Sequence, residues 1–377
     1  MGRSSAEEIR DLARRIAIDT LAPRASEIDQ KHSFPWENIN ELRKAGLWGA
    51  GISEKEEGFE FNRVCFVALV KEIAKACAST ALIYVSHTIV AKAIEHTDSS
   101  AIKKKWQEML KEKFLGAVAV HEPDCGSNAG AIATHAKKEG DAYIVNGSKF
   151  FITSAGEADI YLVLVRTDPE KGPQGMSTLL IERDSPGLSF GRPEDKMGLT
   201  GTSTREMFFS DCRVPVENLV GKEGEGPQII GKAVIGWGLF GAAAISAGIA
   251  GFATELAIKH AKERIIAGQP LAVHQAVQFM ITDMILETEA SDALLTACAT
   301  QADLFPDRAV LNALKAKLFA SENAVSVANK AIQVLGGHGY CREYIAERLF
   351  RDARGLMVHF KTSEWLRQDI AKAVMGM

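Results

Sequence analysis

Residues 142–153 read AYIVNGSKFFIT, and residues 160–167 read IYLVLVRT. β-Branched and aromatic residues recur in both stretches with a period near two, which is typical of strands with one face toward a core. Similar runs follow at 177–183 and 205–214, and turn-prone pairs such as Asn146-Gly147 and Gly172-Pro173 interrupt them. The alternation predicts a compact β domain over residues 117–222.

The sequence on either side of this β domain changes to a helical period. Residues 1–116 contain apolar positions three and four apart, and the same spacing returns after Gly226 and continues to residue 377. We therefore predict a helical N-terminal domain over 1–116 and a C-terminal helical bundle over 223–377. The expected fold is multidomain α+β in the order helix, sheet, helix.

Residues 233–253 contain no charged side chain and are long enough to cross a bilayer. Five of them are glycine and seven are alanine, however, so the hydrophobicity per residue is low for a membrane span. The helical period also continues without a break into the charged residues 254–264. We expect a core helix buried on all sides, and no membrane insertion.

The composition excludes several classes of protein. A net charge of −4 gives no basic patch for nucleic acid. The six cysteines are not paired in spacing, and the N-terminus has no apolar signal core, so we expect a reducing, cytoplasmic environment. The group His121, Asp124 and Cys125 lacks zinc-ligand spacing, and we expect no metal site.

Several motifs, taken in their order and spacing, carry a family resemblance. They lie in the middle and C-terminal segments of the chain. Their letters are HEPDCGSNAG at 121–130, KFFITSAG at 149–156, DKMG at 195–198, TRE at 204–206, DCRVP at 211–215, QVLGGHGY at 333–340, RDA at 351–353 and TSE at 362–364. Any one of them is a weak signal. Together they resemble the acyl-CoA dehydrogenases along nearly the whole chain.

That resemblance implies a detailed architecture. It implies an N-terminal α-helical domain, a middle antiparallel β-barrel-like domain and a C-terminal four-helix bundle, assembled as a homotetramer. FAD would lie where the three domains meet, held partly by a neighbouring subunit. An electron-transferring flavoprotein would accept the electrons.

The resemblance also assigns cofactor and substrate residues. Thr153 would donate a hydrogen bond near flavin N5, although a strand threonine with an exposed hydroxyl is the simpler interpretation. Arg264 would face the pyrophosphate, although it also suits a salt bridge at a helix end. The full set of predicted FAD residues is His121, Ser127, Phe151, Thr153, Arg264, Gln333, Gly337, Thr362 and Glu364. The predicted substrate residues are Ser127, Gly238 and Phe360.

The chain departs from the family at the catalytic base. Most members place a glutamate two residues before the Thr-Ser pair of the last motif, which is Phe360 in this sequence. A second subgroup places it on the long central helix, where this chain has Gly238 followed by Leu239. Both carboxylates are missing. Gly236 and Gly238 would enlarge an acyl cavity, whereas Phe360 and Lys361 would fill it.

Three hypotheses follow from the missing glutamate. In the first, His121 or His359 is the catalytic base, because histidine titrates near neutrality. In the second, the reaction needs no such base, as in sulfinate elimination, or runs as enoyl-CoA reduction with an acid instead. In the third, the chain is a non-catalytic flavoprotein subunit. The favoured function is an FAD-dependent oxidoreductase acting on the CH–CH group of an acyl-CoA thioester with a substituted base.

Overall fold

The computed structural model describes residues 5–50, 61–126 and 128–377. The N-terminal part is helical, as predicted. Its elements are α1 (Ser5–Ile16), η1 (Ala17–Leu21), α2 (Ala22–Lys31), α3 (Trp36–Lys44), α4 (Arg63–Ala76), α5 (Ala78–Ile94) and α6 (Ser100–Glu112). Every residue of α5 is buried, whereas α6 buries only Trp106 and Leu110 and turns its lysines to solvent.

The middle part is a β domain, which confirms the prediction from alternation. Its strands are β1 (Gly116–Ala119), β2 (His135–Glu139), β3 (Ala142–Thr153), β4 (Ile160–Arg166), β5 (Met176–Glu182), β6 (Leu188–Phe190), β7 (Thr204–Pro215) and β8 (Leu219–Val220). They form an eight-stranded sheet in the order β6-β7-β3-β2-β4-β5-β8, with β1 added on β4. Most pairs are antiparallel, but β1 and β2 each pair parallel with β4, so the sheet is mixed rather than purely antiparallel.

The C-terminal part is a bundle of long helices. Its elements are α7 (Gly226–Ile229), η5 (Ile230–Gly238), α8 (Leu239–Glu263), α9 (Gln275–Leu304), α10 (Ala309–Leu335), α11 (Gly337–Tyr340), α12 (Ile345–Val358) and α13 (Ser363–Met375). Helix α10 packs against α8, α9, α12 and α13. A short hairpin, β9 (Ile265–Ile266) and β10 (Gln269–Pro270), joins α8 to α9.

The apolar central helix is a core element. Among the described residues, one helical segment, Gly226–Glu263, is long and apolar enough to cross a membrane, and 89% of its most apolar window is buried inside the protein. This burial agrees with the prediction of a core helix. Within this segment, η5 (Ile230–Gly238) is a π-helix, which the sequence pattern did not reveal.

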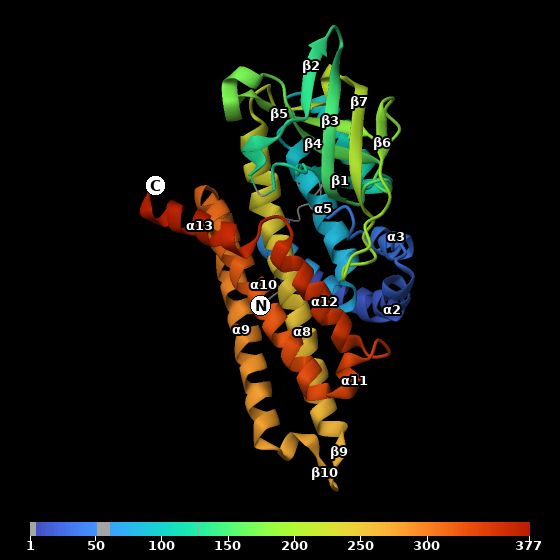
Figure 1. Ribbon diagram of the computed structural model, residues 1–377, viewed down its shortest axis with the longest axis vertical. Helices are drawn as coiled ribbons and strands as arrows, with labels where there is room; N and C mark the ends of the chain where they lie inside the picture. Colours follow the sequence, from blue (N-terminus) through green and yellow to red (C-terminus); the bar gives the residue numbers. More distant parts are fainter. Residues whose placement is uncertain (1–4, 51–60, 127) are drawn as a thin grey trace.

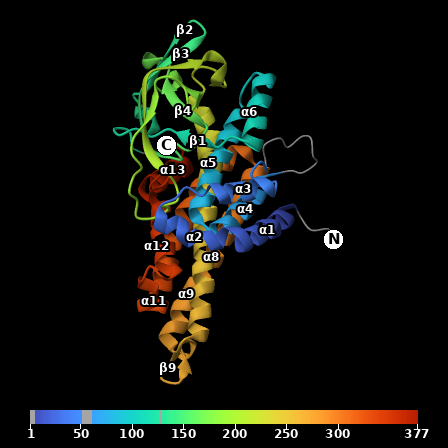
Figure 2. The ribbon, with the colours of Figure 1, turned by 90° about the vertical axis from the view of Figure 1, so that its right-hand side faces the viewer.

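The β domain lies at one end of an elongated molecule, and the α8–α9 hairpin lies at the other (Figure 1). Helix α8 runs along most of this length. The N-terminal helices α1–α4 cover one side near the middle (Figure 2). The turn between α12 and α13 therefore sits where the sheet, the N-terminal helices and the bundle approach one another.

Candidate active site

The turn between α12 and α13 carries Phe360, the position of the missing glutamate. Phe360 has a φ of 59°, a left-handed conformation that side chains other than glycine rarely adopt. The ammonium group of Lys317, on α10, donates hydrogen bonds to the carbonyl oxygens of Met357 at 3.1 Å and Lys361 at 2.7 Å. Lys317 is fully buried, and burial lowers its pKa to about 7. One buried lysine thus fixes both ends of the turn.

The ring of Phe360 lies over Gly238, the position that corresponds to the glutamate of the second subgroup. A Cβ atom added to Gly238 would lie 3.0 Å from Cε1 of Phe360 and 2.9 Å from Cδ1 of Ile89 on α5. The space left by the missing side chain of Gly238 is therefore occupied. Of the two expectations for this cavity, enlargement by Gly238 and filling by Phe360, the contacts at Gly238 agree with filling by Phe360, together with Ile89.

The two predicted histidines lie on either side of Phe360. His121 follows β1, and burial is the main cause that lowers the pKa of its ring, while a hydrogen bond to the backbone of Phe360 acts in the opposite direction. His359 precedes Phe360 in the chain, and burial lowers its pKa to about 4, opposed by a hydrogen bond to the backbone of Gly355. Both rings are neutral at pH 7. A neutral imidazole can accept a proton.

A buried ion pair holds the segment that carries His121. The Lys149 ammonium lies 2.7 Å from a carboxylate oxygen of Glu122 and donates to the carbonyl oxygen of Val120 at 3.2 Å. Glu122 also accepts hydrogen bonds from the amides of Ala133 and Thr134. Sequence reasoning missed this pair, although both residues stand in the quoted motifs. In the sequence, the only indication of this ion pair is a lysine within an apolar strand.

Thr153 ends β3 directly opposite Thr204 on β7. The hydroxyl oxygens of the neighbouring Ser154 and of Thr204 are buried and have no hydrogen-bond partner within the described residues. Phe151 has a φ of 54° and is 58% exposed. Unpartnered buried hydroxyls beside an exposed aromatic ring suit a flat heterocycle with many acceptor atoms. These residues fit the isoalloxazine ring of FAD.

The remaining predicted FAD residues do not join this group within one chain. Arg264 is the C-cap of α8 and is exposed, and Gln333 and Gly337 lie where α10 ends and α11 begins. Both places are near the hairpin end of the bundle, away from the β domain (Figure 1). Helix α8 has 25 residues and rises ~1.5 Å per residue, so Arg264 lies about 37 Å along this helix from Gly238.

Three predicted positions remain. Thr362 is the N-cap residue of α13, and Glu364 lies in the first turn of that helix. The pKa of the Glu364 carboxyl group is lowered, mainly by a hydrogen bond with its own backbone and secondly by one with the Thr362 side chain. Ser127 lies outside the described residues.

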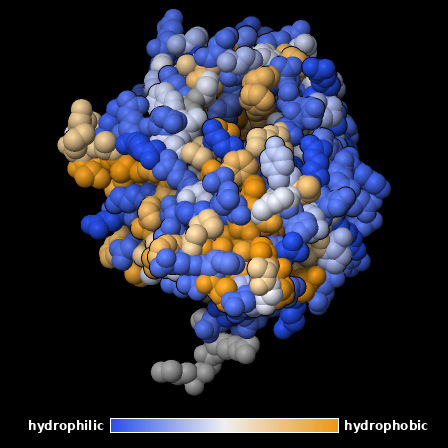
Figure 3. Space-filling view, turned by 60° about the horizontal axis from the view of Figure 1, so that its bottom comes forward, coloured by the Kyte–Doolittle hydropathy of each residue, from blue (hydrophilic) through white to orange (hydrophobic). Residues whose placement is uncertain are grey.

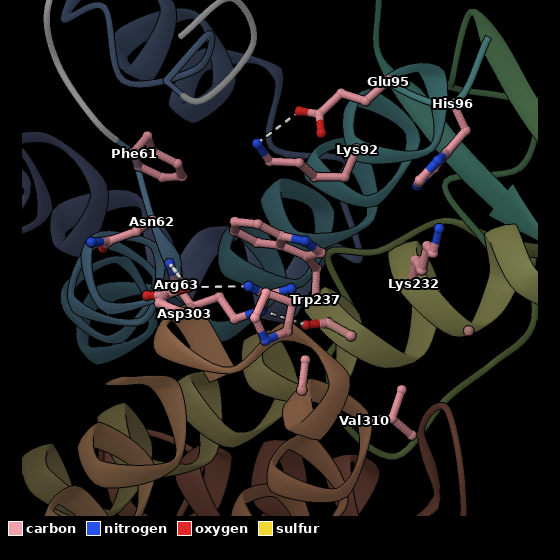
Figure 4. Close-up of a pocket in the computed structure, with 14 residues that line it drawn as sticks. Phe61, Asn62, Arg63, Lys92, Glu95, His96, Lys232, Trp237, Asp303 and Val310 are labelled. Atoms are coloured by element: carbon pink, nitrogen blue, oxygen red, sulfur yellow. Dashed lines mark hydrogen bonds and ion pairs between the residues drawn. The ribbon is translucent and has the colours of Figure 1, made fainter. Parts of the chain in front are cut away.

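A pocket of about 420 Å³ lies among the helices, and Gly236 and Trp237 of η5 form part of its wall (Figure 4). The indole of Trp237 lies between the Arg63 guanidinium and the Lys92 ammonium, each 4.7 Å from the ring. Arg63 is paired with Asp303. Lys232 and His96 point toward one another in Figure 4. The pKa of His96 is lowered, mainly by burial and to a smaller extent by the charge of Lys232. This pocket could not be predicted from the sequence, because its walls come from four separate segments of the chain.

Comparison with known proteins agrees with this architecture. The N-terminal, middle and C-terminal domain models of the acyl-CoA dehydrogenases match residues 3–113, 117–212 and 224–375. The chain belongs to the acyl-CoA dehydrogenase family. It is accordingly an acyl-CoA dehydrogenase-like flavoenzyme with FAD as its cofactor.

Individual relatives cover the whole chain. It is 39% identical to acryloyl-CoA reductase (NADH) of Anaerotignum propionicum, over 98% of this chain and 94% of the relative. It is 38% identical to cyclohex-1-ene-1-carbonyl-CoA dehydrogenase of Syntrophus aciditrophicus, over 97% and 88%. The structure of butyryl-CoA dehydrogenase from Megasphaera elsdenii superimposes with a TM-score of 0.95 at 33% identity, over 100% and 99% of the two chains.

Proposed function

We propose that the protein is an FAD-dependent oxidoreductase that acts on the CH–CH group of an acyl-CoA thioester and uses histidine where relatives use glutamate. The observation that carries this proposal is the contact of Phe360 with Gly238, flanked by His121 and His359. Neither position of the usual carboxylate has an acid or base. His121 and His359 are neutral bases in contact with the Phe360 turn.

The chemistry divides between cofactor and chain. FAD, when bound, supplies the hydride acceptor at N5. The hydroxyl group of Thr153 would hydrogen-bond to the ring, and Phe151 would cover it. A histidine would then remove the proton from the α carbon, since a general base must reach that atom directly or through one water. Burial keeps each imidazole unprotonated at pH 7, so that it can accept a proton, and the same lowering of the pKa makes each ring a weaker base than an exposed histidine.

The pocket around Trp237 offers a route for the thioester. Arg63, Lys92, His96 and Lys232 line it together with two carboxylates, one of which is bound to Arg63. Basic side chains suit the phosphates of coenzyme A. Ser127 and Phe360 would meet the substrate closer to the reacting carbons.

Alanine variants of the two histidines test this proposal. We expect His121→Ala or His359→Ala to slow reduction of the bound flavin by an acyl-CoA thioester by about 100-fold or more, which is the usual contribution of a general base. His135→Ala, an exposed histidine on β2, is the matched control and should reduce at the parent rate. Full activity in both active-site variants would remove histidine as the base.

Enoyl-CoA reduction is the second candidate, favoured by the 39% identity to an acryloyl-CoA reductase. In that direction the α carbon has to receive a proton, and a group other than the two buried histidines would donate it, since both rings are neutral at pH 7. An enoyl-CoA that reoxidises the chemically reduced flavin, without any thioester that reduces the oxidised flavin, would favour this direction. A flavin that no thioester affects would indicate a non-catalytic subunit.

The separation of the FAD residues supports a homo-oligomeric assembly, and we propose a homotetramer. Arg264, Gln333 and Gly337 of one subunit would complete the flavin site of another. Apolar side chains are exposed near the same end of the bundle, among them Ile265, Phe279 and Tyr340. The view from this end shows apolar residues spread between charged ones (Figure 3). A self-association surface there would cover them.

An electron-transferring flavoprotein is the proposed electron partner. A structure reported with the electron transferring flavoprotein of Acidaminococcus fermentans superimposes on this chain with a TM-score of 0.94 at 34% identity, over 99% and 98% of the two chains. We propose that the protein is cytoplasmic, where its cysteines, which form no disulfide within the described residues, would remain reduced.

A further inference from the structure

We infer that Phe360, seated on Gly238, closes the acyl end of the site, so that the enzyme selects thioesters of short, apolar acyl groups. This inference rests on the proposed function, because it takes the carbons bound between Phe360 and the flavin site to be those of an acyl chain. It adds a specificity determinant to that function.

The first support is the close approach of helices α5 and α8. A Cβ atom on Gly241 would lie 2.5 Å from both methyl carbons of Val85, and one on Gly238 would lie 2.9 Å from Ile89. Val85 and Ile89 are both fully buried. Two successive contacts of this kind leave no channel between the helices along this stretch. An acyl chain that extends past Gly238 would have to separate them.

The second support is that Phe360 is fixed in place. Lys317 donates to the carbonyl oxygens of Met357 and Lys361, on both sides of Phe360, and the His121 ring contacts the Phe360 backbone. Helices α12 and α13 flank the turn at residues 358 and 363. A turn whose backbone is held from three directions keeps the attached Phe360 ring in place, so the ring acts as a wall rather than as a gate that moves aside.

The third support is the chemistry of that wall. Phe360, Ile89 and Val85 offer only carbon atoms to a substrate. An acyl group with a hydroxyl or carboxylate at its far end would lose its hydration there without gaining a hydrogen bond. The wall therefore suits a short saturated or unsaturated hydrocarbon acyl group.

Binding of a thioester series tests the inference. Purified holoenzyme is mixed anaerobically with increasing concentrations of butyryl-CoA or octanoyl-CoA, and the concentration at which the rate of flavin bleaching reaches half of its maximum gives an apparent dissociation constant for each. We expect the parent enzyme to bind butyryl-CoA about tenfold or more tightly than octanoyl-CoA, since one methylene changes discrimination by about tenfold or more in an apolar pocket.

Variants at Phe360 assign the preference to that residue. Phe360→Ala should bind octanoyl-CoA about tenfold more tightly than the parent does, with little change for butyryl-CoA. Phe360→Gly is the second variant, because glycine adopts the left-handed backbone of this position without strain. Phe350→Ala, on α12 and packed against the core, controls for general loosening and should keep the parent preference.

The outcomes separate this inference from the proposed function. Equal binding of the two thioesters by the parent enzyme would overturn the inference alone, and so would an unchanged preference in both Phe360 variants. A flavin spectrum that responds to no thioester, in the parent or in the variants, would overturn the proposed function and the inference with it.

Discussion

Two buried lysines support the backbone on either side of the site. Lys317 binds the carbonyl groups of the Phe360 turn, and Lys149 binds Glu122 and the carbonyl oxygen of Val120 beside His121. Burial of a charge is costly unless hydrogen bonds compensate it. Each lysine has such partners, and each therefore connects segments that are distant in the sequence.

Lys317→Met should destabilise the fold and slow flavin reduction. The variant leaves two buried carbonyl oxygens without donors, so we expect the free energy of unfolding to fall by about 2–4 kcal/mol. Urea denaturation measures this change, and stopped-flow absorbance measures the reduction. Lys315→Met, at a partly exposed position on the same helix, should alter neither. A variant at Lys317 with parent stability would show that these hydrogen bonds contribute nothing.

The pH dependence of stability should also change in that variant. The pKa of Lys317 is lowered from 10.5 in the unfolded chain to about 7 in the folded protein, mainly by burial. Between these two values the unfolded chain binds more protons, so this group makes stability rise with pH from 7 toward 10.5 and lowers it as pH falls to 7. We expect Lys317→Met to lack this increment in denaturation at pH 7 and pH 9. The same slope in both proteins would contradict the assignment.

Glu122→Gln should be more harmful than the loss of a surface ion pair. It leaves the Lys149 ammonium buried without its countercharge, and we expect a loss of about 3–5 kcal/mol in urea denaturation. The exposed pair of Lys137 and Glu139 is the control. Glu139→Gln should cost less than about 1 kcal/mol, because solvent screens that pair. Similar losses at the two sites would refute the role given to Glu122.

At the scale of the elements, the sequence predicted what periodicity can encode. Alternation located β3, β4, β5 and β7, and the alanine-rich, uncharged run at 233–253 located the buried core helix. The π-helix over 230–238 was missed, because its apolar pattern resembles that of an α-helix. The parallel pairing of β1 and β2 with β4 was missed as well, since alternation does not specify the partner of a strand.

The contact between α5 and α8 can be tested with two glycines of the same helix. Gly241→Ala places its methyl group against Val85, where overpacking should cost about 1–3 kcal/mol. Gly251→Ala meets only the flexible Lys75 side chain, at 3.5 Å, and should stabilise the helix by up to about 1 kcal/mol. Thermal unfolding of the two variants compares them. Equal effects would contradict the close approach at Gly241.

At the scale of the whole molecule, the motifs predicted the family. His121, Thr153 and the run around 333–337 stand in the motifs. Phe360 was located by its distance from the last motif, and Gly238 by its place on the central helix. Lys317 and the pocket around Trp237 were not predicted. For Lys317, the available indication was a lysine on the alanine-rich face of α10. The pocket around Trp237 is formed by four segments that only the fold brings together.

Subunit mixing tests the proposed division of the flavin site between chains. Thr153→Ala and Arg264→Glu should each release FAD more readily. If the site takes Thr153 from one chain and Arg264 from its neighbour, a co-assembled pair of these variants contains one site with both native residues. We expect co-expression to restore part of the bound flavin, measured by absorbance after gel filtration. No recovery would place both residues in a site within one chain.

The most direct test of the account is an anaerobic absorbance spectrum of the purified holoenzyme before and after addition of a series of acyl-CoA thioesters. We predict an oxidised flavin band that a short-chain thioester bleaches in the parent enzyme and bleaches much more slowly in the His121→Ala or His359→Ala variant. A flavin that no saturated thioester reduces would contradict dehydrogenation as the activity of this protein.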